Sequence, residues 1–194
     1  GLGSTGSVNI ETGSATGGNS GSITLAVGST DTGSGGAIKL CAGETTATGA
    51  LGGDVVINAG INEASDTVAA VGGAVKLFSG AGHNTAGGEI SMLVGDGSGL
   101  DGGAVRVRAG RTTAAGMCGG GVFINGGDGV GASAGQGGSI VCYAGYGQTA
   151  TGGSLVISSG MSNSTSSGDV TVQTANAGPN GGISGSLYFD SGDS

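Results

Sequence analysis

Aspartates in glycine-rich turns are the residues of this chain whose type and spacing could bind a metal ion. Asp96 and Asp101 lie in the stretch GDGSGLDGG, and Asp128 lies in GGDGVG. Ca²⁺ binds carboxylate and backbone carbonyl oxygens, and Gly/Asp turns of this kind hold ions in calcium-binding repeats. The nonapeptide period of those repeats is missing here. The three aspartates are therefore weak calcium candidates, with plain turn formation as the alternative, and we expect no other cofactor.

Two stretches match the pattern of dinucleotide-binding loops, but neither predicts a cofactor site. They are GLGSTG at 1–6 and GSGLDG at 97–102. Phosphate binding by such a loop requires that the pattern open a helix, and in a chain with 50 Gly among 194 residues it arises by composition alone. His83 is the one His of the chain, so no second imidazole can join it in a transition-metal site. We expect no catalytic residue and no enzymatic activity.

Two further features concern covalent modification. The triplet NST, which begins at Asn163, is an acceptor for an N-linked sugar, and we expect a glycan there only if the protein is secreted. Cys41, Cys118 and Cys142 are an odd number of cysteines at irregular spacing. This spacing does not fix a pairing, so a disulfide and unpaired thiols both stay open.

The dominant feature of the sequence is an eight-residue phrase that returns twelve times. It opens with Gly, has an aliphatic residue at its third position and an apolar residue at its fifth, and closes with Gly in every copy but one, which closes with Ala175. GAVKLFSG at 73–80 is one copy. The phrases open at residues 6, 21, 36, 53, 73, 88, 103, 120, 138, 153, 168 and 185.

Apolar residues at a spacing of two, enriched in β-branched types, predict strands with one face committed to a core. The sequence thus predicts an all-β fold: a β-solenoid, or β-helix, of about twelve short strands in a single repeat domain over 1–194. Steps of 15, 15 and 17 residues, followed by 20 or 18, group the strands into three blocks of four, at about 6–72, 73–137 and 138–194. A closed antiparallel three-block fold, prism-like, is the alternative.

Large apolar side chains also recur at equivalent positions on the predicted outward side of the strands. The chain has only three Phe and three Tyr, so their concentration there predicts a face that meets another molecule. The alternative is that a second sheet of the same protein covers them. This predicted assembly face consists of Val56, Phe78, Leu93, Phe123, Tyr143 and Tyr188.

Charge and composition exclude several partners. The formal net charge is −8, and only 9% of the residues are charged, so a basic surface for nucleic acid or anionic lipid is missing. No apolar run approaches the length of a membrane span. A chain this rich in Gly, Ser and Thr is usually a disordered linker, but the strict apolar pairs argue for order here.

The wording GG-x-V-x-L-x-x-G, as at 72–80, resembles the Gly/Ser-rich repeats of large surface proteins. These include filamentous-haemagglutinin-type adhesins of bacteria and surface repeat proteins of algae and other protists. The resemblance covers nearly the whole chain, and it implies an extracellular or cell-surface β-solenoid used for adhesion, walls or fibres. It offers no catalytic residues.

The function expected from these features is that of a non-enzymatic structural protein of an extracellular filament, sheath or surface layer. It would assemble with copies of itself through β-solenoid stacking or lateral packing. The alternative is an adhesin or carbohydrate-binding surface module that uses exposed aromatic side chains on glycans. A polysaccharide-degrading enzyme would need paired carboxylates, and the predicted strands carry none at matching positions.

Overall fold

The computed structural model of the chain describes residues 3–63, 71–131 and 135–193. Within these ranges the backbone forms neither a helix nor a strand. The prediction of an all-β β-solenoid of about twelve strands is therefore wrong, and its closed prism-like alternative is wrong for the same reason. A strand exists only where a neighbour pairs with its backbone. Alternating side chains show that a segment can be extended, but they do not place that neighbour within the same chain.

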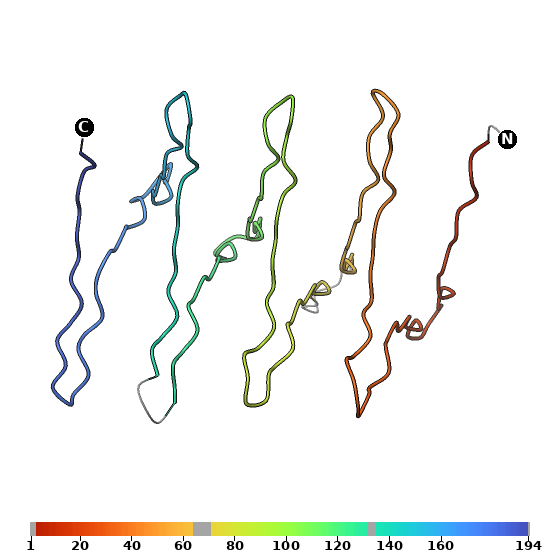
Figure 1. Cartoon of the computed structure of the whole chain (residues 1–194), viewed down its shortest axis with the longest axis horizontal. Helices are drawn as coiled ribbons and strands as arrows, with labels where there is room; N and C mark the ends of the chain where they lie inside the picture. The colour runs from red at the N-terminus through yellow and green to blue at the C-terminus, as the bar shows by residue number, and fades with distance from the viewer. Residues whose placement is uncertain (1–2, 64–70, 132–134, 194) are drawn as a thin grey trace. The chain divides into compact units, whose positions relative to one another are not determined.

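The chain divides into two units, Gly1–Leu93 and Val94–Ser194. All twelve phrases lie within the described residues. In both units the phrases run as extended segments that are joined by loops, here called arcs (Figure 1). Each arc runs from the closing residue of one phrase to the opening Gly of the next. The grouping of the phrases into three blocks stays a prediction.

The conformation of an arc depends on the length of the step between the two phrases that it joins. All six arcs of the 15-residue steps contain a three-residue bend, whereas the three arcs of the 17-residue steps contain a turn. The bends lie at 16–18, 31–33, 83–85, 98–100, 148–150 and 163–165, and the turns at 48–49, 115–116 and 179–181.

Two of the turns share their hydrogen bonds and their glycine. In the first, the Ala47 N–H donates to Thr45 Oγ1 at 3.2 Å, and the Ala50 N–H donates to the Ala47 carbonyl at 3.2 Å. Gly49 stands between them with φ 76°, a conformation that costs a residue with a Cβ about 1 kcal/mol or more. The turn GRTTAAG repeats the pattern of GETTATG, with Thr112 Oγ1 as acceptor and Gly116 at φ 74°.

Seven arcs are closed by one backbone hydrogen bond between their two boundary glycines. In each, the N–H of the opening Gly donates to the carbonyl of the preceding closing Gly, at 2.8 to 3.0 Å. We call this contact the glycine clasp. A Cβ on the opening Gly53 would lie 3.2 Å from the Gly43 N, so a larger residue there would have to displace the neighbouring backbone by a few tenths of an ångström. The clasped pairs are Gly43/Gly53, Gly60/Gly73, Gly80/Gly88, Gly110/Gly120, Gly127/Gly138, Gly145/Gly153 and Gly160/Gly168.

The seventh residue of the phrase separates clasped arcs from open ones. In front of the seven clasped arcs it is Ala, Ser or Gly, namely Ala42, Ala59, Ser79, Ala109, Gly126, Ala144 and Ser159. The other four arcs, all of whose residues the structure describes, have no clasp. There the seventh residue is β-branched: Thr12, Val27, Val94 and Thr174.

The γ-methyl of the β-branched residue accounts for the missing clasp. A Cβ built on Gly36 would lie 2.8 Å from Val27 Cγ1, and one on Gly185 would lie 3.6 Å from Thr174 Cγ2. In clasped arcs the backbone N of the closing Gly occupies the corresponding place beside the opening Gly. In the open arcs a γ-methyl thus stands beside the opening Gly where the clasped arcs have backbone, and we expect it to keep the two boundary residues apart.

Candidate functional site

No described residue of the chain is buried. The solvent-accessible surface of the chain is 19258 Å², although its mass is only 17.7 kDa. A compact folded monomer of that mass exposes about 8,000 Å². The excess of about 11,000 Å² exceeds several times the ~1,600 Å² that a standard protein–protein interface buries in total. The described residues therefore form no core of the kind that a compact monomer buries.

Exposure varies along the segments, but among the described residues it never falls to burial. The aliphatic residues at the third position range from 45% exposed at Ile38 to 64% at Leu155, with Val8 at 89% as the exception. The fifth position, which was also predicted to face inward, is about as exposed as the outward positions: Phe189 is 84% exposed and the neighbouring outward Tyr188 is 85% exposed. Partial cover is therefore confined mainly to the third position, and the predicted alternation does not extend to the fifth.

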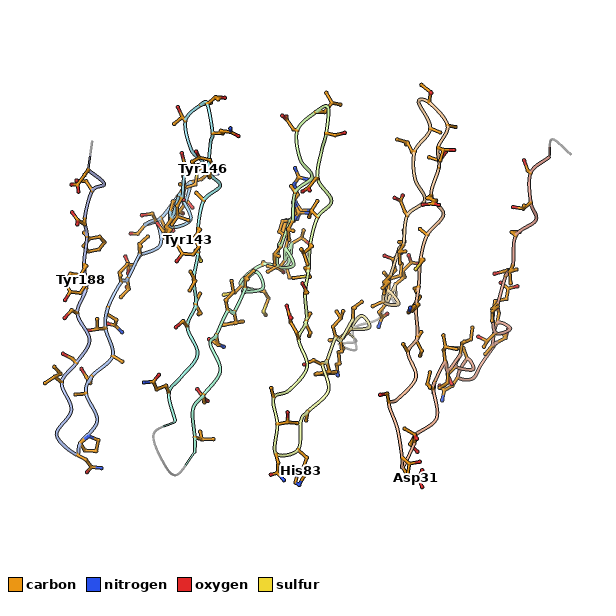
Figure 2. The ribbon with its side chains drawn as sticks, viewed as in Figure 1. Asp31, His83, Tyr143, Tyr146 and Tyr188 are labelled. Atoms are coloured by element: carbon orange, nitrogen blue, oxygen red, sulfur yellow. The ribbon has the colours of Figure 1, made fainter. Side chains whose placement is uncertain are left out.

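All six residues of the predicted assembly face are exposed, from 72% at Val56 to 91% at Tyr143. A second sheet of the same protein does not cover them in the described residues. Tyr188 stands on the side of the last extended segment (Figure 2). Whether another molecule contacts this face stays a prediction.

The backbone of the segments is as open as their side chains. Two backbone hydrogen bonds lie within the turns, and the remaining seven among the described residues are the glycine clasps. Positions two to seven of all twelve phrases have no backbone partner. A folded protein contains about one internal hydrogen bond per residue. These segments therefore carry rows of backbone donors and acceptors without a backbone partner, and the Ser191 N–H donates instead to Asp190 Oδ1 at 2.9 Å.

Charge is distributed unequally between segments and arcs. The twelve segments contain four basic and five acidic residues, a net charge of −1. The rest of the sequence contains one basic and eight acidic residues, a net charge of −7, which together with the segments gives the total of −8. The arcs are thus the acidic, solvated parts, and the segments are nearly neutral.

The metal candidates do not form a cluster. Among the described residues, which include Asp96, Asp101 and Asp128, no three or more His, Cys, Asp or Glu side chains come together as metal ligands. Asp31 and His83 lie at the tips of their arcs (Figure 2). Asp96, Asp101 and Asp128 are exposed, and the structure does not bring them together as a ligand set.

A hollow lies in the second unit. It is open, has a volume of about 620 Å³ and is lined by Arg108, Ala109, Gly110 and Arg111. No carboxylate lines it, so it does not offer the acid–base pair that glycoside cleavage requires.

The modification candidates are accessible. Asn163 lies in the exposed bend at 163–165, where Ser162 Oγ accepts the Thr165 N–H at 3.0 Å and lies 2.9 Å from Thr165 Oγ1. Cys41, Cys118 and Cys142 are all exposed free thiols. Cys142, which stands at an inward position of its segment, is therefore not buried as a small apolar side chain.

Two local features of the structure were not predicted from the sequence. One is the role of the seventh residue, which could have been noticed because this position holds either a small or a β-branched residue in every phrase. The other is the T-T-A-x-G turn, whose signal was the exact return of that pattern in GETTATG and GRTTAAG. Both are short-range features, and both could have been read from aligned phrases.

Within the part of the chain that the structure describes, no helix is long and apolar enough to span a membrane. Comparison with known proteins gives no relative from which a function could be transferred: no family model, no curated protein and no solved structure matches this chain.

Proposed function

We propose that this chain is a non-enzymatic structural protein that assembles with copies of itself into an extracellular filament, sheath or surface layer. The observation that carries the proposal is the absence of any buried residue in the described part of an orderly repetitive chain. Apolar side chains at every third and fifth phrase position would remain in water in a monomer, which is unfavourable in proportion to their exposed area. Association is the route by which they leave it.

The composition supports an assembly of like chains over a complex with a different partner. The segments are nearly neutral and carry the same apolar pattern twelve times, so one copy offers to another the surface that it needs itself. The extracellular location rests on the resemblance to Gly/Ser-rich surface repeats.

Sedimentation and electron microscopy of the purified full chain test this proposal. It predicts that monomer is scarce at micromolar concentration and that filaments or sheets form. A monodisperse monomer at millimolar concentration contradicts it.

An adhesin or carbohydrate-binding module is the second candidate, favoured by the exposure of three tyrosines. Tyr143, Tyr146 and Tyr188 are 91%, 89% and 85% exposed. Flat aromatic side chains with one polar end are suited to stacking on sugar rings while remaining hydrated. Binding of soluble monomer to a glycan array, lost on replacement of these tyrosines by Ser, would favour this function.

A further inference from the structure

We infer that the copies in the assembly lie parallel and in register, each segment paired with the same segment of the next copy. This inference rests on the proposed self-assembly and names its partner, a second copy of this chain. The pairs form between chains, since the described part of one chain contains no strand.

The two-residue spacing of the apolar third and fifth positions fixes the register at the level of one residue. Third-position side chains are about half exposed in eleven of the twelve segments. A slip by one residue turns every apolar side chain of a paired segment to the opposite face. Pairing that keeps third positions on third positions forms continuous apolar rows, and identical copies achieve this in all twelve segments at once.

The arcs fix the register at the level of the whole chain. Steps of 15, 15, 17 and 20 are followed by 15, 15, 17 and 18, so a shift by one block lays unequal arcs on each other. A reversed copy would begin with 17 and match worse. The clasps agree: a shift by one block would lay the open arc 13–21 over the clasped arc 80–88. Only the unshifted parallel arrangement matches every arc with its equal.

Like charges then stand on like charges, and the segments carry few of them. Nine charged residues occur in the twelve segments. Like charges directly opposite each other on paired strands destabilise the pair. The concentration of the net charge in the arcs leaves the paired regions with little repulsion to overcome.

The three cysteines report on this register. Paired strands lie about 4.8 Å apart, and a disulfide joins Cα atoms that are about 4.4–6.8 Å apart. Cys41, Cys118 and Cys142 are exposed and free. In a parallel in-register stack each thiol lies beside the same thiol of the next copy. In a two-fold dimer a residue meets itself only at the axis, so three widely separated cysteines cannot all do so.

The experiment uses three full-length variants that each keep one cysteine, made from Cys41→Ser, Cys118→Ser and Cys142→Val. Each is assembled, oxidised with a mild disulfide-forming reagent, and examined by non-reducing gel electrophoresis. Microscopy and sedimentation of the same samples record the assembly independently. The control is the triple variant without cysteine, which must assemble to the same extent and give no covalent dimer.

We expect covalent dimer in most of the material for all three variants, and at least tenfold less when oxidation takes place below the assembly concentration. If filaments form but no cysteine position gives a self-cross-link, the proposed register is wrong and the proposed function still stands. Cross-links at one position only would indicate a two-fold pair and also overturn it. Absence of assembly in every variant and in the unaltered chain would overturn both.

Discussion

Cγ1 of Val94 lies 2.5 Å from the place that a Cβ on Gly103 would occupy. The side chain at the seventh position of one phrase therefore lies beside the opening glycine of the next phrase. The arc between them, 95–103, has no clasp, whereas the neighbouring arc 80–88 begins after Ser79 and has one at 2.9 Å. One methyl group thus decides whether an arc closes.

Replacing a β-branched seventh residue by a small one is predicted to close an open arc, and the reverse replacement is predicted to open a clasped arc. Val94→Ala removes the methyl group and should allow the Gly103 N–H to donate to Gly95, and Ala109→Val should abolish the clasp between Gly110 and Gly120. A solvated hydrogen bond of about 0.5–1.5 kcal/mol slows amide exchange by about two- to tenfold. Exchange of the two opening glycine amides, followed by NMR on labelled monomer below the assembly concentration, measures the effect. Unchanged rates in both variants would refute the role of the methyl group.

The turn at Gly49 is predicted to tolerate no side chain. Gly49→Ala places a Cβ at φ 76°, which costs about 1 kcal/mol. If the turn is formed in the assembly, this cost raises the critical concentration about fivefold. Gly13→Ala is the matched control, because nothing lies within 4 Å of the added Cβ and its φ is not in the left-handed region. Equal critical concentrations for the two variants would show that the turn is not needed.

A charge at a third position is predicted to block assembly. Val105→Asp places a carboxylate in the apolar row of every copy, where burying an unpaired charge costs several kcal/mol. We expect the critical concentration to rise more than about a hundredfold, the equivalent of ~2.7 kcal/mol. Thr32→Asp adds the same charge at the exposed bend of an arc and should change it little. Similar losses in both variants would indicate that net charge, and not the segment face, governs assembly.

Salt and pH are predicted to act through the arcs. The net charge of −8 at pH 7 falls towards zero near the pI of about 4.1. Repulsion between stacked copies therefore weakens as the pH falls from 7 towards 4, and added salt screens it at pH 7. Turbidity and sedimentation should show faster assembly under both conditions. Slower assembly at pH 5 than at pH 7 would contradict this account.

The sequence predicted where the chain is extended but not its fold class. The structure contains the twelve phrases as extended segments (Figure 1), although without the predicted strand pairing. The contrast between bends and turns also follows from short-range chemistry, but it was not predicted. The prediction of a β-solenoid was wrong because an alternating pattern such as that of residues 73–80 indicates only that an apolar face must be covered. Whether that cover belongs to the same chain depends on long-range pairing, which twelve nearly identical phrases do not encode.

The candidate site shows the same division. Phe123 and Tyr188 are exposed as their outward phase predicts, but Phe189 at an inward position is exposed to the same extent, 84% against 85% at Tyr188. The exposure of Cys142 could not be predicted from its inward position, because a thiol at such a position is buried only if the chain itself supplies a core. With Gly at 50 of 194 residues and few large side chains, the chain has few side chains from which to build such a core.

Fibre diffraction from oriented, unaltered full-length protein tests most directly whether the segments are covered by other copies. Pairing of segments between copies predicts a strong reflection at about 4.7–4.8 Å along the fibre axis. A sample that stays monomeric at millimolar concentration and gives only diffuse scattering would contradict the account.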